Sequence, residues 1–270
     1  MAVSFTAITG FMVYSRSIGY ELIQLALAVF ILAGGASALN QYQEFTYDAN
    51  MQRTKSRPIP AAKLSLNQAL LISLIFIISG SIFLFYFFGI TTSLLGLFNV
   101  LWYNLLYTNL KRITPFAVVP GSLTGAVPVL MGWTAAGGYL FDKEIIFIAF
   151  FIFIWQIPHF WLLMLKYGKD YEAAGFPTIN QTVSALNLKR IIFSWIISTS
   201  FASIMVPVFL EDISLILFIS IFILNIVFVA VFAKISFGKI EEIDFKKSFV
   251  GINIYMFLFM MIITLYHLLG

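Results

Sequence analysis

Three side chains that carry oxygen atoms stand four residues apart at the end of a long apolar stretch: Asn40, Glu44 and Asp48. On a continuing helix, positions i, i+4 and i+8 lie on one face, one turn apart. Amide and carboxylate oxygens are hard ligands that suit Mg²⁺, an ion often shared with substrate phosphates. A solvated helix end beside a polar loop is the simpler alternative. The metal site is favoured because polar groups inside an apolar span usually serve a function.

Basic side chains that suit phosphate follow soon afterwards. Arg53 and Arg57 come after Asp48 in the same polar segment, and a guanidinium group can form two parallel hydrogen bonds to a phosphate. Lys111 and Arg112 stand in another short polar segment, from which they can reach phosphates or carboxylates of a ligand. Oxygen ligands for a metal, followed by cations for phosphate, predict a diphosphate site.

A second charged stretch contains Lys166, Lys169, Asp170 and Glu172, and it closes another apolar segment. One of its acids could complete the metal site or hold a second metal ion. Taken alone, the stretch favours an ordinary solvated loop after a membrane helix. Its predicted position on the same membrane face as the first set of residues favours a shared site.

The segment 155–161, Trp-Gln-Ile-Pro-His-Phe-Trp, carries one of the two histidines. His159 could ligate haem iron, take up a proton or simply hydrogen-bond to a neighbour, and the last role is favoured for a lone histidine. Trp155, Phe160 and Trp161 could form an aromatic belt at the membrane interface. They could equally form the wall of a cavity and stabilise a cation through their π faces. The other histidine, His267, is interpreted as interfacial.

The composition limits the class of protein. Of the 270 residues, 61% are hydrophobic and 10% are charged, whereas soluble domains contain about 25% charged residues. A soluble or disordered chain is therefore excluded, and the absence of cysteine excludes thiolate-bound zinc and iron–sulfur clusters. The net charge of +4 does not indicate nucleic-acid binding, because the basic residues fall in separate loops.

The apolar stretches predict an all-α, polytopic membrane bundle of about nine helices, forming one domain over residues 1–270. All Lys and Arg residues except Arg16 and Lys143 fall in alternate loops. The positive-inside rule therefore predicts a multi-pass protein of the inner (cytoplasmic) membrane, with a cytoplasmic N-terminus and cytoplasmic site loops. The helices are expected at about 1–14 (short for a span), 18–42, 64–88, 90–109, 114–137, 144–166, 188–210, 213–235 and 247–268.

The sequence contains neither a GxxxxGK[ST] phosphate loop nor a nucleophile elbow. What remains is a metal site, cations, a histidine and aromatic walls within a membrane. These groups suit the ionisation of an allylic diphosphate and the protection of the resulting carbocation from water.

The spacing of Asn40, Glu44 and Asp48 resembles the first Asp-rich motif of the UbiA superfamily of intramembrane prenyltransferases. Further stretches resemble one branch of it more narrowly, the protohaem IX farnesyltransferases. The segment 155–161 is quite specific for that branch, and the matches cover about residues 30–180 in the expected order. They lie at 51–60, 107–112, 125–133, 155–161 and 170–177.

The resemblance implies transfer of a farnesyl group from farnesyl diphosphate to a vinyl group of haem B, which gives haem O for terminal oxidases, with Mg²⁺ as cofactor. It implies a bilayer environment and makes contact with haem A synthase or a terminal oxidase under assembly possible. His159 would lie near the haem or handle a proton. Metal and diphosphate would be held by Asn40, Glu44, Asp48 and Asp170. The phosphates would be bound by Arg53, Arg57, Lys111, Arg112 and Lys169. The substrate pocket would be lined by Tyr107, Trp155, Phe160 and Trp161.

Three features depart from the family pattern. Glu44 stands where the family usually has Asp, and Ala117 replaces a common Asn. The usual Lys-Pro-Arg stretch before the first span is missing here, so the first helix is expected to lack its opening turn or two. The alternatives are a UbiA-type enzyme with another acceptor (a quinone precursor, chlorin or lipid), a haem carrier or transporter without catalysis, and a structural subunit of an oxidase.

Overall fold

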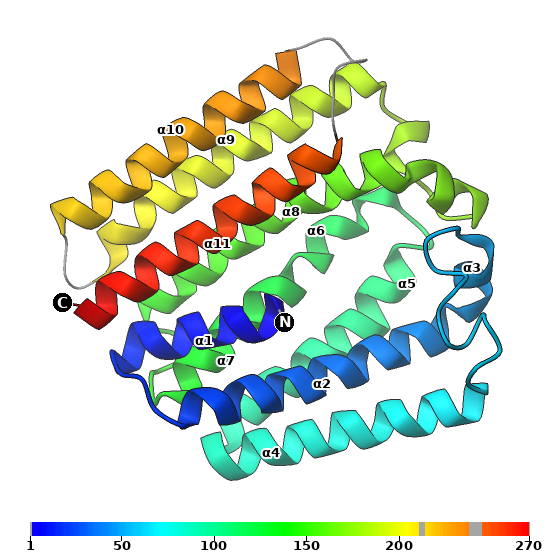
Figure 1. Cartoon of the computed structure of the whole chain (residues 1–270), viewed down its shortest axis with the longest axis horizontal. Coiled ribbons are helices and arrows are strands. Elements are labelled where there is room, and N and C mark those ends of the chain that lie inside the picture. Colours follow the sequence, from blue (N-terminus) through cyan, green and yellow to red (C-terminus); the bar gives the residue numbers. More distant parts are fainter. Residues whose placement is uncertain (1, 211–213, 238–244, 270) are drawn as a thin grey trace.

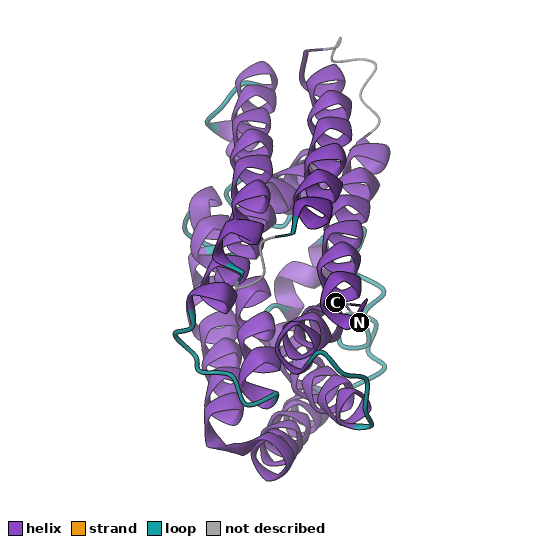
Figure 2. Ribbon diagram, turned by 90° about the vertical axis from the view of Figure 1, so that its left-hand side faces the viewer, coloured by secondary structure: helices purple, strands orange, loops and turns teal. Residues whose placement is uncertain are grey.

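In a computed structural model that describes residues 2–210, 214–237 and 245–269, long helices lie roughly along one direction and pack side by side (Figure 1). The described part consists of helices joined by turns and loops and contains no β-strand (Figure 2). Seven of its helical stretches are long and apolar enough to cross a membrane. The predicted all-α membrane bundle is therefore confirmed.

The long helices are α2 (Glu21–Gln43), α4 (Leu66–Leu101), α8 (Lys143–Ala173), α9 (Ala185–Phe209), α10 (Leu215–Phe237) and α11 (Phe245–Leu269). The shorter helices are α1 (Ala2–Ser15), α3 (Phe45–Asn50), α5 (Thr108–Leu110), α6 (Val118–Gly121) and α7 (Leu123–Ala135). A π-helical turn at Trp102–Tyr107 joins α4 to α5, and 3-10 turns occupy Pro115–Ala117 and Ile179–Gln181.

Helix α4 consists of two antiparallel arms. Gly89 has a left-handed φ of +82° and interrupts the helix, a conformation that glycine adopts without steric cost. Across this turn the Ser93 hydroxyl donates to the carbonyl oxygen of Ser81 at 2.9 Å. The candidate span Leu66–Leu110 thus contains both predicted helices, 64–88 and 90–109. With the arms counted separately and the short α1 included, the nine expected helices are all present in the described chain.

Local signals explain where individual helices begin. Ser65 forms a capping box with Gln68: its hydroxyl accepts from the Gln68 N–H, and its own N–H donates to the Gln68 side chain at 2.9 Å. This arrangement satisfies backbone donors that the first turn of α4 leaves free. Ser184 caps α9 in a simpler way, by accepting from the N–H of Asn187.

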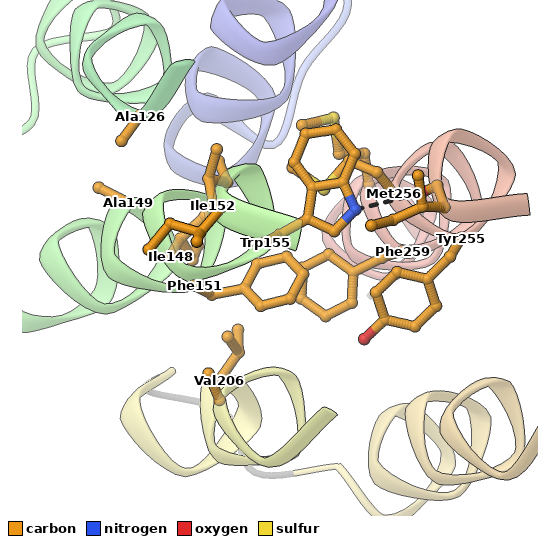
Figure 3. Packing of buried hydrophobic residues seen from close by; sticks show 14 of the residues in the cluster. Ala126, Ile148, Ala149, Phe151, Ile152, Trp155, Val206, Tyr255, Met256 and Phe259 are labelled. Carbon is orange, nitrogen blue, oxygen red and sulfur yellow. Dashed lines mark hydrogen bonds between the residues drawn. The ribbon is translucent and has the colours of Figure 1, made fainter. Parts of the chain in front are cut away.

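One apolar core joins α8 to the C-terminal helices. Phe151 of α8 packs against Phe259 of α11 with ring centroids 4.0 Å apart, and the indole N–H of Trp155 donates to the Ile252 carbonyl oxygen at 3.1 Å (Figure 3). A second core lies among α1, α2, α4 and α7. There a Cβ at Gly132 would stand 1.8 Å from the Ala7 carbonyl oxygen, so the approach of α1 to α7 requires glycine.

Helix α8 is longer than expected. The sequence suggested an end near residue 166, whereas the helix continues to Ala173. Lys166, Lys169, Asp170 and Glu172 therefore lie on its last turns rather than in a loop. These turns, α3 and α5 gather at one end of the molecule, on the right in Figure 1. The basic connection after α10, which contains Lys239, lies outside the described residues.

Candidate active site

A cavity of about 410 Å³ lies among α2, α4, α7 and α8. Its mouth is polar and its interior is mostly apolar. The charged residues that line it are Glu44, Asp48, Arg53, Arg57 and Lys111. Apolar lining comes from Val29, Leu32, Ala33, Ala36, Val100 and Met131. Asn40 and Tyr107 also line the cavity, between the charged residues and the apolar residues.

The first three predicted residues converge on this cavity, although not on one continuous helix. Helix α2 ends at Gln43, and Glu44 has a non-helical φ of −118° and ψ of 13° before α3 begins. Two backbone bonds keep the four-residue spacing across the break: Glu44 N–H to Asn40 carbonyl at 3.0 Å, and Asp48 N–H to Glu44 carbonyl at 2.8 Å. All three side chains are buried. The irregular residue thus turns the chain without separating the three oxygen-bearing groups.

Two ion pairs close the polar end. The Lys111 ammonium donates to Glu44 Oε2 at 2.6 Å, and the Arg57 guanidinium donates to Asp48 Oδ2 at 2.7 Å. Burial lowers the pKa of Lys111, and the negative charge of Glu44 opposes this shift. The second oxygen of Glu44, Oε1, is buried and has no hydrogen-bond partner in the described part of the chain. The mouth therefore holds compensated charges together with one oxygen that is free to bind a ligand.

Aromatic rings form a wall directly beside the ion pairs. Tyr103, Tyr107 and Phe160 stack in sequence, with ring centroids 5.8 Å and then 5.9 Å apart. The Lys111 ammonium lies 5.4 Å from the Tyr107 ring. Asn40 reaches the same level and donates to Thr108 Oγ1 at 3.0 Å. Because π faces attract cations, this wall can stabilise positive charge that develops inside the cavity.

The end of α8 holds the segment that follows α3. Asp170 Oδ2 accepts from the backbone N–H of Arg53 at 3.2 Å, and the Arg53 side chain donates to the Tyr171 hydroxyl at 3.1 Å. The Arg53 guanidinium also lies 5.2 Å from the Tyr167 ring. Among the described residues, Arg53 and Tyr171 line the cavity but Asp170 does not. Lys169 is exposed on the outer side of the helix.

Other predicted residues point elsewhere. Arg112 donates to the Gln43 carbonyl oxygen at 2.7 Å and covers the Tyr47 ring, so it caps the end of α2. The His159 ring lies 4.9 Å from both the Trp155 and the Phe249 rings, between α8 and α11, and its Nδ1 atom has no partner among the described residues. Trp161 faces Trp195 of α9. Of the four aromatic side chains in the segment 155–161, Phe160 is the one that lines the cavity.

Two features of the site were not predicted. Tyr103 lines the cavity one turn before Tyr107, and its four-residue spacing is a usable signal. Asn104 fixes the π-helical turn to α2: its amide donates to the Ala36 carbonyl oxygen at 3.0 Å and to Gln43 Oε1 at 3.1 Å. A buried amide within an apolar span is the signal for such a residue.

The donor set fits a magnesium ion shared with a phosphate ligand. The described residues contain no group of three or more His, Asp or Glu side chains placed to hold a metal by themselves. Glu44 and Asp48 nevertheless offer two carboxylates beside the Asn40 amide, and Glu44 Oε1 has no partner among the residues that the structure describes. Mg²⁺ commonly uses one or two carboxylates together with water and substrate phosphates rather than an all-protein cage.

Comparison with known proteins agrees with this geometry. Residues 3–263 match the UbiA prenyltransferase family. The chain belongs to this family. A protein from Nitratidesulfovibrio vulgaris, named protoheme IX farnesyltransferase, is 38% identical over 184 residues. That match covers 68% of this chain and 64% of the relative, so just under two thirds of the relative's length is represented.

Solved structures show the same fold. A digeranylgeranylglyceryl phosphate synthase matches with a TM-score of 0.78 and 16% identity, over 99% of this chain and 94% of that one. A UbiA homologue from Archaeoglobus fulgidus, bound to GPP and Mg²⁺, matches with a TM-score of 0.66 and 12% identity, over 100% and 96% of the two chains. At these identities the likeness shows the UbiA fold alone.

Proposed function

We propose that the protein is a protohaem IX farnesyltransferase that joins the farnesyl group of farnesyl diphosphate to a vinyl group of haem B. The observation that carries the proposal is a single cavity with acids and cations at its mouth and an apolar interior walled by aromatic rings. Such a cavity can hold both ends of a prenyl diphosphate. Relatives named protoheme IX farnesyltransferase support haem B as the acceptor.

The residues at the mouth would hold the diphosphate. Arg53, Arg57 and Lys111 would contact its oxygens, and Asn40, Glu44 and Asp48 would hold Mg²⁺. When bound, the ion supplies positive charge at the leaving oxygens. Asp170 would act through the Arg53 backbone, which it already contacts. Two predicted phosphate ligands are less well placed to contact the diphosphate: Arg112 caps the end of α2, and Lys169 is exposed.

The reaction breaks the bond between the first farnesyl carbon and the diphosphate oxygen, and the electron pair leaves with the diphosphate. Lys111 and Arg57 stabilise the negative charge that forms there. Tyr107 and Phe160 stabilise the allylic cation until the vinyl π electrons of haem B attack it. The new cation on the acceptor then takes hydroxide from water, which releases a proton and leaves the hydroxyl group of haem O. The apolar walls keep water away from the allylic cation until the vinyl group has attacked it.

His159 and the two tryptophans would act on the acceptor side. His159 lies next in sequence to Phe160 and on the side of α8 that faces α11. It would contact the haem or take up the proton released with the hydroxyl group. Trp155 and Trp161 would shape this side. The mouth would open to the cytoplasm of an inner membrane, because the basic residues that follow α3 and α5 and those at the end of α8 lie at that end of the molecule (Figure 1). Contact with haem A synthase or a terminal oxidase stays a prediction of the resemblance.

The test is a product assay on membranes that contain the protein. Haem B, farnesyl diphosphate and Mg²⁺ are supplied, and the extracted haems are identified by mass. We expect a hydroxyethylfarnesyl product that is lost on chelation. Prenyl transfer only to quinone precursors, chlorins or lipids would contradict haem B as the acceptor. If folded protein transfers no prenyl group at all, the proposed prenyltransferase activity is wrong.

Asp48→Asn provides the matched variant for this assay. It keeps the shape of the side chain but removes the negative charge that faces Arg57. We expect turnover to fall at least 100-fold, comparable to the loss of one transition-state contact. Glu21→Gln, in the first turn of α2 and far from the mouth, is the control. Turnover by Asp48→Asn close to that of the control would contradict the metal site.

A further inference from the structure

We propose that the far end of the cavity, formed by Leu32, Gly96 and Met131, sets the length of prenyl chain that the protein accepts. This inference rests on the proposed function, because it places the prenyl chain in this cavity. The three residues lie away from the charged mouth and take no part in releasing the diphosphate. They would determine specificity rather than catalysis.

Two helices supply much of the cavity lining, and they run in the same direction (Figure 1). One is α2, and the other is the second arm of α4 with its continuation to Lys111. Contacts at successive levels, from the mouth inward, join Glu44 to Lys111, Asn40 to Thr108, and Ala36 to Asn104. Further inward, the end of the Leu32 side chain lies beside Gly96, which stands eight positions before Asn104 and is therefore deeper than the Leu32 backbone. Depth in the cavity can therefore be measured by the rise of α2.

This depth matches three isoprenoid units. Val29 is the deepest residue of α2 that lines the cavity, and it stands eleven positions before Asn40. At about 1.5 Å per residue, the step from Asn40 to Val29 is about 16 Å. An isoprenoid unit adds four main-chain carbons, so three extended units span about 15 Å and four span about 20 Å at ordinary bond lengths. A farnesyl chain therefore fits between Asn40 and the far end of the cavity, whereas a geranylgeranyl chain is too long for this space.

Side-chain ends close the cavity at Gly96. A Cβ at this position would lie 2.6 Å from Leu32 Cδ2, 3.0 Å from Leu84 Cδ1 and 3.2 Å from Met131 Cε. Leu32 and Met131 are buried and line the cavity. Because these atoms are the ends of flexible side chains, a larger residue at Gly96 would push them toward the chain. A smaller residue at Met131 would deepen the cavity.

Two variants are expected to shift donor choice in opposite directions. Met131→Ala should raise the kcat/KM ratio of geranylgeranyl to farnesyl diphosphate at least tenfold. Gly96→Ala should raise the ratio of geranyl to farnesyl diphosphate at least tenfold. One methylene in a hydrophobic pocket changes discrimination by about 10- to 200-fold. A general loss of stability cannot produce both shifts.

Met256→Ala is the matched control, because Met256 is a buried methionine of α11 that does not line the cavity. Its ratios should equal those of the wild type. The proposal is overturned if Met131→Ala and Gly96→Ala keep both wild-type ratios within twofold.

Thermal stabilisation by each diphosphate with Mg²⁺ gives a second readout that needs no acceptor. Wild-type protein that is stabilised by farnesyl diphosphate but modifies no haem B would contradict only the proposed acceptor. The chain-length proposal is then decided by the same comparison of variants in the stabilisation assay. Wild-type protein that is stabilised by none of the three diphosphates would contradict both proposals.

Discussion

The two ion pairs at the mouth decide how a ligand can bind. Each pair joins a carboxylate that is expected to bind the metal to a cation that is expected to bind phosphate. Glu44 pairs with Lys111, and Asp48 pairs with Arg57. A diphosphate with its metal brings charges of both signs. Binding can therefore exchange one set of charge contacts for another and leave no buried charge without a partner, which would be costly.

A comparison of a single and a double variant separates the structural role of Lys111 from its functional role. Lys111→Met leaves the Glu44 carboxylate buried and unpaired, so we expect a loss of about 3 kcal/mol in unfolding free energy. Lys111→Met combined with Glu44→Gln removes both charges and should regain most of that stability. Neither variant should turn over substrate. Unfolding in detergent and product mass measure the two effects, and a double variant as unstable as Lys111→Met would contradict the pairing.

His159→Phe tests the imidazole without removing the ring. Phenylalanine keeps the packing between Trp155 and Phe249, so the variant should unfold at about the wild-type temperature. We expect turnover to fall at least tenfold, because the ring nitrogens are lost. Phe249→Leu changes the same packing and keeps the imidazole, which makes it the control. If His159→Phe turns over substrate at the wild-type rate, His159 contributes only to packing.

At the scale of elements, breaks in helices position the site. Glu44 interrupts the chain between α2 and α3, and the π-helical turn at Trp102–Tyr107 is fixed to α2 by Asn104. π-Helical turns occur frequently at functional sites. Gly89 reverses α4 so that its second arm returns alongside the first. Together these breaks bring Lys111 to Glu44, 67 residues away in sequence.

Gly89→Ala tests the reversal of α4. Apart from its immediate neighbours, no described residue has an atom within 4 Å of a Cβ at this position, so the cost comes from the positive φ alone. We expect a loss of about 1 kcal/mol or more in stability, with donor KM unchanged. Gly34→Ala in α2 would make only ordinary contact with Phe76 and serves as the control. Equal melting temperatures for the two variants would contradict a strained turn.

The sequence predicts the spans well, because long apolar stretches and basic loops are direct physical requirements of a bilayer. It also indicates that Asn40, Glu44 and Asp48 approach one another. It does not show which of two adjacent residues faces the cavity. Neighbours on a helix point about 100° apart, so Lys111 and Arg112 diverge, as do His159 and Phe160. Pairing across helices depends on their register, which no local pattern contains.

At the scale of the whole molecule, two packed halves have different tasks. Helices α1, α2, α4 and α7 share one core and enclose most of the cavity, while α8 joins them to a second core with α9, α10 and α11. The end of α8 also anchors Arg53 through Asp170. Motion between the halves would therefore alter the mouth and the acceptor side together.

In the proposed reaction, diphosphate and prenyl chain occupy this one cavity, and the acceptor meets them at the aromatic wall. A structure of the protein with Mg²⁺ and a non-hydrolysable thio analogue of farnesyl diphosphate tests it most directly. We expect phosphates in contact with Lys111 and Arg57, and a chain that runs along α2 and ends at Met131. A chain that lies between α8 and α11, beside His159, would contradict it.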